Sequence, residues 1–173
     1  MLKNRNFFIV AVLLAIFDIF TKFMAKLYFL NEAGEVVKSP VEIIGNYFRL
    51  NFVYNPGVAF GIRVGGRYLL SAITIVLIIF IMVVLYKIDI KRKIEKFAYT
   101  LILGGALGNF YDRAVYGKVV DFFDSDFPDF IMERWPVFNV ADSYVSIGMG
   151  LLILQYFILD PLNRRKNRLQ EKV

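Results

Sequence analysis

The chain has 173 residues, of which 58% are hydrophobic and 21% are charged, and its formal net charge is +6. It contains no cysteine and no histidine, which excludes disulfides and thiol nucleophiles and removes the commonest general base and the commonest metal ligand. A composition this apolar is typical of polytopic membrane proteins, and we expect residues 1–173 to form one integral-membrane domain.

Four stretches are long and apolar enough to cross a bilayer as helices, which takes about 20 residues each. They lie at about residues 7–27, 68–86, 97–115 and 137–159. The first follows Lys3 and Arg5, as the apolar region of a signal peptide would. We expect it to be retained, because it is too long for that region, contains Asp18 and precedes no small-residue cleavage site.

Lysine and arginine are unevenly distributed between the two sides of this four-helix arrangement. Twelve lie at the N-terminus, in the loop 87–96 and in the C-terminal tail, against six on the other side: five in the loops 31–66 and 116–136, and Arg67 just after the first of these loops. The positive-inside rule therefore predicts cytoplasmic termini and two outward-facing loops. The excess positive charge is explained by topology and by attraction to anionic lipid, so no nucleic-acid partner is predicted.

The outward-facing loop 31–66 is too long to be a simple connection. Its segment FRLNFVYN, residues 48–55, alternates apolar and polar side chains, as a half-buried strand does. NPG at 55–57 predicts a turn, and VAFGI after it a return strand. We therefore expect a small extracytoplasmic β-sheet between the first and second helices.

Polar side chains of three predicted helices occupy the same depth, in the outer half of the bilayer. In the first helix Asp18 and Lys22 are four residues apart and share a face. The other polar residues at this depth are Asn109, Asp112 and Arg113 in the third helix and Asn139 and Asp142 in the fourth. Charges inside a bilayer are costly and mark functional sites by default, so their convergence predicts a site.

Several of these groups also have a purely structural explanation. Asp18 and Lys22 can form a structural ion pair, and Asn109 and Asn139 can hydrogen-bond between helices. Arg113 can extend to the membrane interface.

Two further features have an equally simple interpretation. The small residues GGALG at 104–108 favour close helix packing. Acidic residues in the loop 116–136 are most simply solvated; these are Asp124, Asp126, Asp129 and Glu133.

Asp142 and Asp121, which lies in VVDFFD beyond the third helix, together suggest a chemistry. Two carboxylates that share one proton can hydrolyse an amide: one activates water and the other donates to the carbonyl oxygen. Like charge at short range and partial burial both raise one of the two pKa values. This is one of the few hydrolytic mechanisms available without histidine or cysteine.

Five motifs occur along the chain in an order that resembles a known family. They are DIFTK (18–22), NPGVAFG (55–61), GGALGNFYDR (104–113), VVDFFD (119–124) and FNVADS (138–143). Together they resemble the bacterial lipoprotein signal peptidases, also called signal peptidase II, which are membrane aspartyl proteases. The loop 116–136 is longer and more acidic than the family pattern.

The resemblance implies that Asp121 and Asp142 are the catalytic pair. Positions that support the pair or position substrate would be Asp18, Lys22, Asn55, Gly57, Asn109, Arg113 and Asn139. The substrate would be a prolipoprotein cut just before a cysteine that bears diacylglycerol, at the extracytoplasmic face of the bacterial inner membrane. No metal or organic cofactor is implied. Membrane lipid is the other expected partner, we expect a monomer, and the 31–66 sheet would clamp the substrate from above.

Three other functions fit parts of the sequence. A proton- or cation-coupled transporter would use Asp18 and Asp142 as a relay, although transporters usually place such sites near the midplane within internal repeats. A serine protease would pair Ser143 or Ser146 with Lys22, without further motifs to support it. A purely structural membrane subunit is the remaining alternative.

Overall fold

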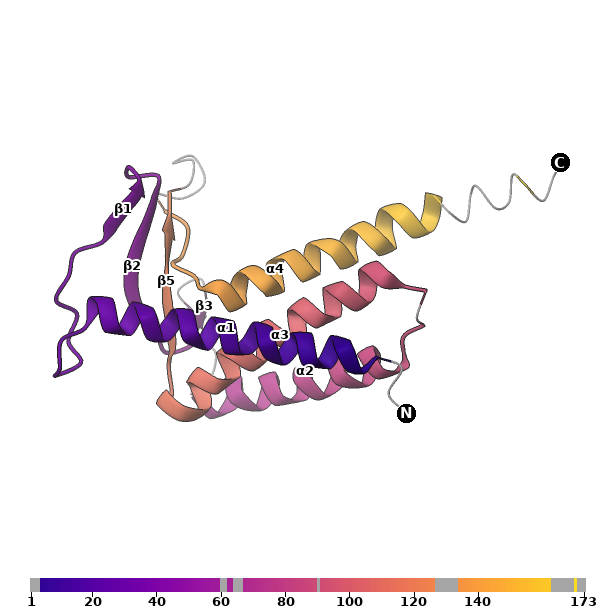
Figure 1. Cartoon of the computed structure of the whole chain (residues 1–173), viewed down its shortest axis with the longest axis horizontal. Coiled ribbons are helices and arrows are strands. Elements are labelled where there is room, and N and C mark those ends of the chain that lie inside the picture. Colours follow the sequence, from indigo (N-terminus) through magenta and orange to yellow (C-terminus); the bar gives the residue numbers. More distant parts are fainter. Residues whose placement is uncertain are drawn as a thin grey trace.

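The computed structural model describes residues 4–59, 62–63, 67–89, 91–126, 134–162 and 170. Long helices run side by side, and a small sheet lies across one end of them, opposite the start of α1 and the end of α4 (Figure 1). The helices are α1 Arg5–Phe29, α2 Arg67–Lys87, α3 Lys93–Tyr116 and α4 Val140–Ile153, which continues as the π-helix η1 Leu154–Leu159. The four predicted helical segments therefore all coincide with helices.

Helix α3 packs against α1, α2 and α4, and small residues allow the close approach. A Cβ atom on Gly104 would come within 2.8 Å of the Leu14 Cβ in α1, and one on Gly105 would collide with the Ala141 carbonyl in α4. The predicted packing role of GGALG is thus confirmed.

The outer faces of the other helices are apolar and exposed. Phe17 in α1, Val76 in α2 and Phe157 in η1 are 53%, 67% and 77% exposed, which indicates contact with lipid. Among the described residues, the helices long and apolar enough to cross a membrane are Arg5–Phe29, Leu69–Lys87 and Val140–Leu162. Helix α3 is not among them, so the fourth crossing stays a prediction.

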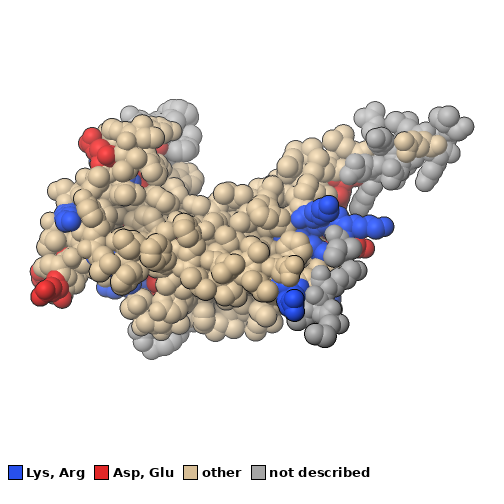
Figure 2. All heavy atoms as spheres, in the orientation of Figure 1, with Lys and Arg blue, Asp and Glu red and all other residues tan. Residues whose placement is uncertain are grey.

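An apolar belt separates the charged groups at the two ends of the molecule. Figure 2 shows lysine and arginine side chains gathered beside the start of α1, whereas acidic side chains appear together with basic ones at the end that carries the sheet. This distribution agrees with a membrane-spanning protein. Which end of the molecule lies on the cytoplasmic side stays a prediction.

The sheet has the strand order β1–β2–β5 and is antiparallel throughout, with strands β1 Val41–Ile44, β2 Phe48–Asn55 and β5 Val119–Ser125. The predicted strand at 48–55 is therefore confirmed. The predicted return strand after NPG does not pair with β2. Its residues form β3 Val58–Ala59, which pairs with β4 Ile62–Arg63 in a separate two-stranded sheet. Strand β2 instead pairs with β5, which begins just after α3.

Burial explains why β5 takes this place. Val120 and Phe122 of β5 pack with Phe29 and Phe52 in a buried apolar cluster between the sheet and the end of α1. Their segment is therefore a strand of the core, not part of a solvated loop.

Asp124, predicted to be solvated, is only 2% exposed, so that prediction is wrong. Its carboxylate accepts from Arg49 Nη2 and from Arg134 Nε, each at 2.7 Å. Burial raises the pKa of Asp124, but hydrogen bonds from Arg134 and Arg49 lower it more, and the net pKa is below the ordinary value. Asp126 lies 3.7 Å from Arg134, and Asp129 and Glu133 lie outside the described residues.

Candidate functional site

Asp121 reaches the helix bundle because the chain reverses after α3. Gly117 ends that helix in the left-handed conformation, with φ 71°, which glycine adopts without strain. Strand β5 then returns over the helix end, where the Val120 backbone N–H donates to the Asp112 carboxylate at 3.1 Å. Asp121 itself is 2% exposed.

The NPG turn positions the side-chain amide of Asn55 beside Asp121. The Asn55 side-chain oxygen accepts from the Gly57 N–H at 2.8 Å, and its Nδ2 donates to Asp121 Oδ2 at 3.0 Å. Gly57 has φ 99°, and a Cβ there would collide with Leu70, so the turn needs glycine.

Asp142 lies in the first turn of α4, where Asn139 caps the helix. The Asp142 N–H donates to Asn139 Oδ1 at 3.0 Å, and the Asn139 N–H donates to Asp142 Oδ2 at 3.1 Å. This reciprocal capping box and the positive end of the helix dipole both favour a carboxylate at this position. The other oxygen, Asp142 Oδ1, accepts from Asn109 Nδ2 at 2.8 Å.

Asn139 connects the two carboxyl groups. Its side chain is fully buried and donates from Nδ2 to Asp121 Oδ1 at 2.6 Å, while its backbone holds Asp142. The same Nδ2 lies 3.2 Å from Asn109 Oδ1. The structure therefore holds Asp121 and Asp142 through a shared set of asparagine amides.

Electrostatics favour a proton on Asp121. Burial and the neighbouring charge of Asp142 raise the pKa of Asp121 to about 7, although hydrogen bonds from Asn55 and Asn139 act in the opposite direction. Near neutral pH, Asp121 therefore retains a proton much more readily than an ordinary aspartate does. A pair of this kind has both an acid and a base available at once.

Lys22 compensates negative charge on the buried acids next to Asp121 and Asp142. Its ammonium group lies 2.7 Å from Asp18 Oδ2, 2.8 Å from Asn109 Oδ1 and 3.6 Å from Asp112 Oδ2. Asp18 in turn accepts from the Ala141 N–H at 2.8 Å. The predicted Asp18–Lys22 ion pair is confirmed, and it extends through Asn109 to Asp142.

Space for this network depends on a small residue in α3. A Cβ atom on Gly108 would collide with the Asp18 carboxylate. A larger side chain there would therefore displace the ion pair.

Arg113 also faces the acids. Its guanidinium interacts electrostatically with Asp142, Asp121 and Asp112, and its Nε is buried without a hydrogen-bond partner among the residues that the structure describes. Anchoring at the membrane interface alone does not account for this position.

The structure brings all nine predicted site residues to the end of the bundle that carries the sheet. Asp112 lies with them: the sequence pattern predicts it at this depth, but the family resemblance does not include it among the site positions. Its spacing of three residues from Asn109 was the available signal, because that spacing puts both on one helix face. Within the described ranges, no group of three or more acidic side chains is arranged to hold a metal ion.

Comparisons with known proteins identify relatives of this chain in sequence and in fold. A family model described as signal peptidase (SPase) II matches residues 10–158. The lipoprotein signal peptidase of Brevibacillus brevis is 38% identical over 162 residues, which cover 94% of this chain and 99% of that protein. The lipoprotein signal peptidase of Francisella tularensis subsp. novicida is 38% identical over 153 residues, covering 86% and 89%. A bacterial membrane enzyme solved by the in meso method is similar with a TM-score of 0.74 at 30% identity, covering 88% of this chain and 87% of that one.

Proposed function

Because the chain belongs to the signal peptidase II family, we propose that it is an aspartic endopeptidase that removes signal peptides from prolipoproteins. The cut falls just before a cysteine that bears diacylglycerol, and Asp121 and Asp142 activate the attacking water. The observation that carries this proposal is Asn139, which binds Asp121 with its side chain and Asp142 with its backbone.

The two carboxyl groups take different roles at the start of the reaction. Asp142, at the helix N-terminus, is the base that removes a proton from water, and Asp121 donates its proton to the carbonyl oxygen. The hydroxide adds to the carbonyl carbon and forms a tetrahedral intermediate. The cysteine nitrogen then takes the proton that Asp142 acquired, and the C–N bond breaks. At the same time a hydroxyl group of the intermediate returns its proton to Asp121 and becomes the carbonyl of the new carboxylic acid.

The surrounding residues hold this arrangement before the substrate arrives. Asn55, Asn109 and Asn139 orient the carboxylates, and Lys22 balances the charge of Asp18 and Asp112. Arg113 lowers the cost of the negative charge that moves to Asp121 when Asp121 has given up its proton. Gly57 supports Asn55 through the turn. The sheet, which includes Asp121 itself, covers the site and clamps the substrate.

The position of the site suits a substrate anchored in lipid. The acyl chains and the signal helix both remain in the bilayer, so the bond to be cut is presented at the membrane boundary. We place the protein in the bacterial inner membrane as a monomer with α3 as its fourth span, both termini in the cytoplasm and the site near the extracytoplasmic face. Its partners are diacylglyceryl-modified prolipoproteins and membrane lipid.

Cleavage by the purified protein in detergent tests this function. A prolipoprotein with diacylglyceryl-cysteine is compared with the same chain carrying an unmodified cysteine, and mass spectrometry identifies the products. We expect one cut, before the cysteine, with kcat/KM about 100-fold higher for the modified form, because binding energy from the acyl chains contributes to catalysis. Equal cleavage of both forms contradicts the proposed substrate class, and proton flux in liposomes without cleavage favours the transporter.

A further inference from the structure

Three segments of the chain carry the residues that hold the candidate site together beside the sheet. Strand β2 ends at Asn55, β5 contains Asp121, and the segment 134–139 ends at Asn139. The two strands are paired along most of their length. The segment 134–139 belongs to neither strand, so its position against β5 depends on individual contacts.

Backbone hydrogen bonds hold the segment 134–139 against β5 only near its two ends. The Trp135 N–H donates to a β5 carbonyl at 3.1 Å, and Phe138 exchanges hydrogen bonds of 2.7 and 3.0 Å with Phe123. Between these contacts lies Pro136, which has no N–H to donate. The backbone ladder is therefore interrupted in the middle of the segment.

A buried ion-pair cluster ties the beginning of this segment to the sheet. Asp124 of β5 accepts from Arg134 Nε with Oδ1 and from Arg49 Nη2 of β2 with Oδ2, each at 2.7 Å. The Arg134 guanidinium also donates to the Asn46 carbonyl, in the turn between β1 and β2, at 3.1 Å. We call Asp124, Arg49 and Arg134 the Asp124 cluster. Its single buried carboxylate connects all three segments.

The Asp124 cluster makes no direct contact with the catalytic pair. In the described part of the chain, its partners outside the cluster are Asn46, Asn51 and Asp126. Replacing a buried ion pair with apolar residues is often neutral for stability, whereas its hydrogen bonds can specify one arrangement of the segments that carry it. The arrangement specified here includes the 2.6 Å contact between Asn139 Nδ2 and Asp121 Oδ1.

We propose that Asp124 and Arg134 are positioning residues for the reaction, because they hold the segment 134–139 so that Asn139 keeps the two catalytic carboxyl groups together. This inference rests on the proposed function, since it assigns a role in that chemistry. Displacing reacting groups by about 1 Å costs about 100-fold in rate. Loosening the segment a few residues before Asn139 therefore slows the reaction without removing any group that takes part in it.

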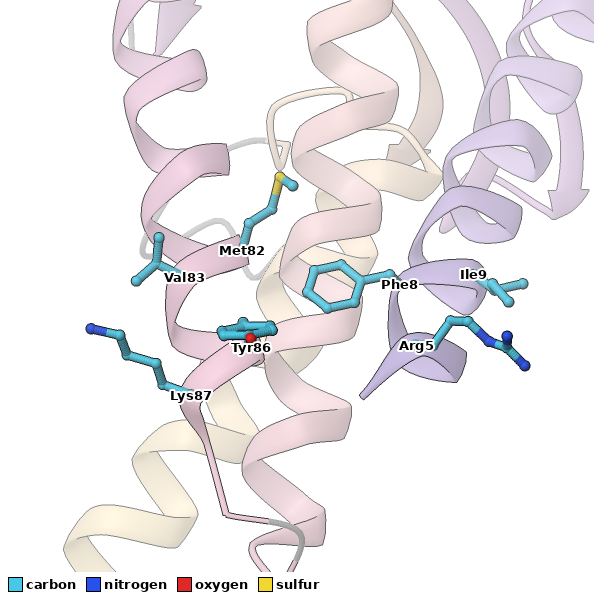
Figure 3. Close-up of a pocket in the computed structure, with 7 residues that line it drawn as sticks. All are labelled: Arg5, Phe8, Ile9, Met82, Val83, Tyr86 and Lys87. Carbon is cyan, nitrogen blue, oxygen red and sulfur yellow. The ribbon is translucent and has the colours of Figure 1, made fainter. Parts of the chain in front are cut away.

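The opposite end of the bundle supplies a matched control. Arg92 there is paired with two carboxylates, Glu95 and Asp160, at 2.6 and 2.8 Å. At that end α1 and α2 also border a groove of about 620 Å³ with apolar walls, from which the charged ends of Arg5 and Lys87 point away on opposite sides (Figure 3). Removal of Arg92 thus breaks two ion pairs far from the catalytic pair.

Arg134→Gln is expected to lower kcat for a diacylglyceryl-modified prolipoprotein by about 10- to 100-fold, with KM changed by less than about twofold. Arg92→Gln is expected to retain kcat. Unchanged cleavage by Arg134→Gln overturns the proposal. An equal loss in both variants also overturns it, because the loss then comes from general destabilisation. A raised KM at unchanged kcat does so too, because it indicates a substrate contact.

A disulfide separates the effect of position from the effect of charge. Asp126 and Arg134 are antiparallel bridge partners, and the Cα atoms of such partners lie about 4.5–5.5 Å apart, within the range that a disulfide spans. The chain has no cysteine, so Asp126→Cys with Arg134→Cys creates one pair of thiols.

We expect the oxidised double variant to recover most of kcat although it lacks the arginine, and reduction to lower kcat to the level of Arg134→Gln. Asp126→Cys alone should retain kcat. The substrate is unaffected by reduction, because its cysteine sulfur is held in a thioether. An oxidised form as slow as the reduced form contradicts a positioning role.

Infrared spectroscopy tests the same role without cleavage. The carboxyl band of Asp121, identified by its absence from Asp121→Asn, is recorded below its pKa of about 7. In Arg134→Gln it should move to higher wavenumber, because the hydrogen bond from Asn139 is weaker, and in Arg92→Gln it should not move. A band that Arg134→Gln leaves in place overturns the inference. If the unsubstituted protein cleaves no prolipoprotein, the proposed function fails, and the band still decides whether Arg134 positions Asn139.

Discussion

Asn in place of Asp142 is expected to lower kcat for prolipoprotein cleavage by about 10³-fold or more, and Asn in place of Asp121 is expected to do the same. Each change keeps the size of the side chain but removes a group that gives or takes a proton. Binding of the acyl chains and the signal helix does not depend on these protons, so KM should change little. The measurement is single-turnover and steady-state cleavage of a diacylglyceryl-modified prolipoprotein.

Asp126→Asn is the matched control, because Asp126 follows the same strand but contacts Arg134 and not the asparagine amides of the site. It should cleave at nearly the rate of the unsubstituted protein. The double variant of Asp121 and Asp142 should be no slower than either single variant, since the two groups act as one unit. Normal cleavage by Asp121→Asn shows that the two-carboxylate mechanism is wrong.

Met in place of Lys22 is expected to lower the free energy of unfolding by about 3–5 kcal/mol, because it leaves the buried carboxylates of Asp18 and Asp112 without their cation. Lys22 is 1% exposed and Asp18 is fully buried, so water cannot replace the lost charge without opening the helix packing. Thermal unfolding in detergent, followed by circular dichroism, measures the change.

Lys26→Met provides the comparison one turn along α1. Lys26 is only half-buried and lies 3.6 Å from the centroid of the Tyr116 ring, a contact that contributes about 1 kcal/mol. Adding Asp18→Asn to Lys22→Met should restore part of the stability by removing one uncompensated charge. If Lys22→Met unfolds at the same temperature as Lys26→Met, the charge-balancing role of Lys22 is contradicted.

The helices were predictable because each is a long apolar run, and such runs specify a helix locally. The depth of the site was predictable for the same reason, since a constant rise per residue brings Asp18, Asn109 and Asp142 to one level. Gly105 and Gly108 were less predictable. Their small size indicates close packing, but the residues that they pack against, Ala141 and Asp18, are known only from the structure.

The sheet was harder to predict because its pairing is not local. FRLNFVYN reads correctly as a strand, yet its alternation does not say which segment lies beside it. The partner, β5, is separated from β2 by two helices, and what selects it is the burial of Val120 and Phe122. The same long-range pairing sets Asp124 between Arg49 and Arg134, which no local pattern of charges indicates.

Infrared spectroscopy of protonated carboxyl groups shows whether Asp121 and Asp142 hold one proton between them. In the unsubstituted protein, a carboxyl band that is absent from Asp121→Asn should disappear as pH rises through about 7. In Asp142→Asn the band should persist but disappear at lower pH, because burial still raises the pKa of Asp121 while the repulsion from Asp142 is gone. Titration of Asp121 near the ordinary aspartate value of about 3.9, or a midpoint that Asp142→Asn leaves unchanged, contradicts the shared proton.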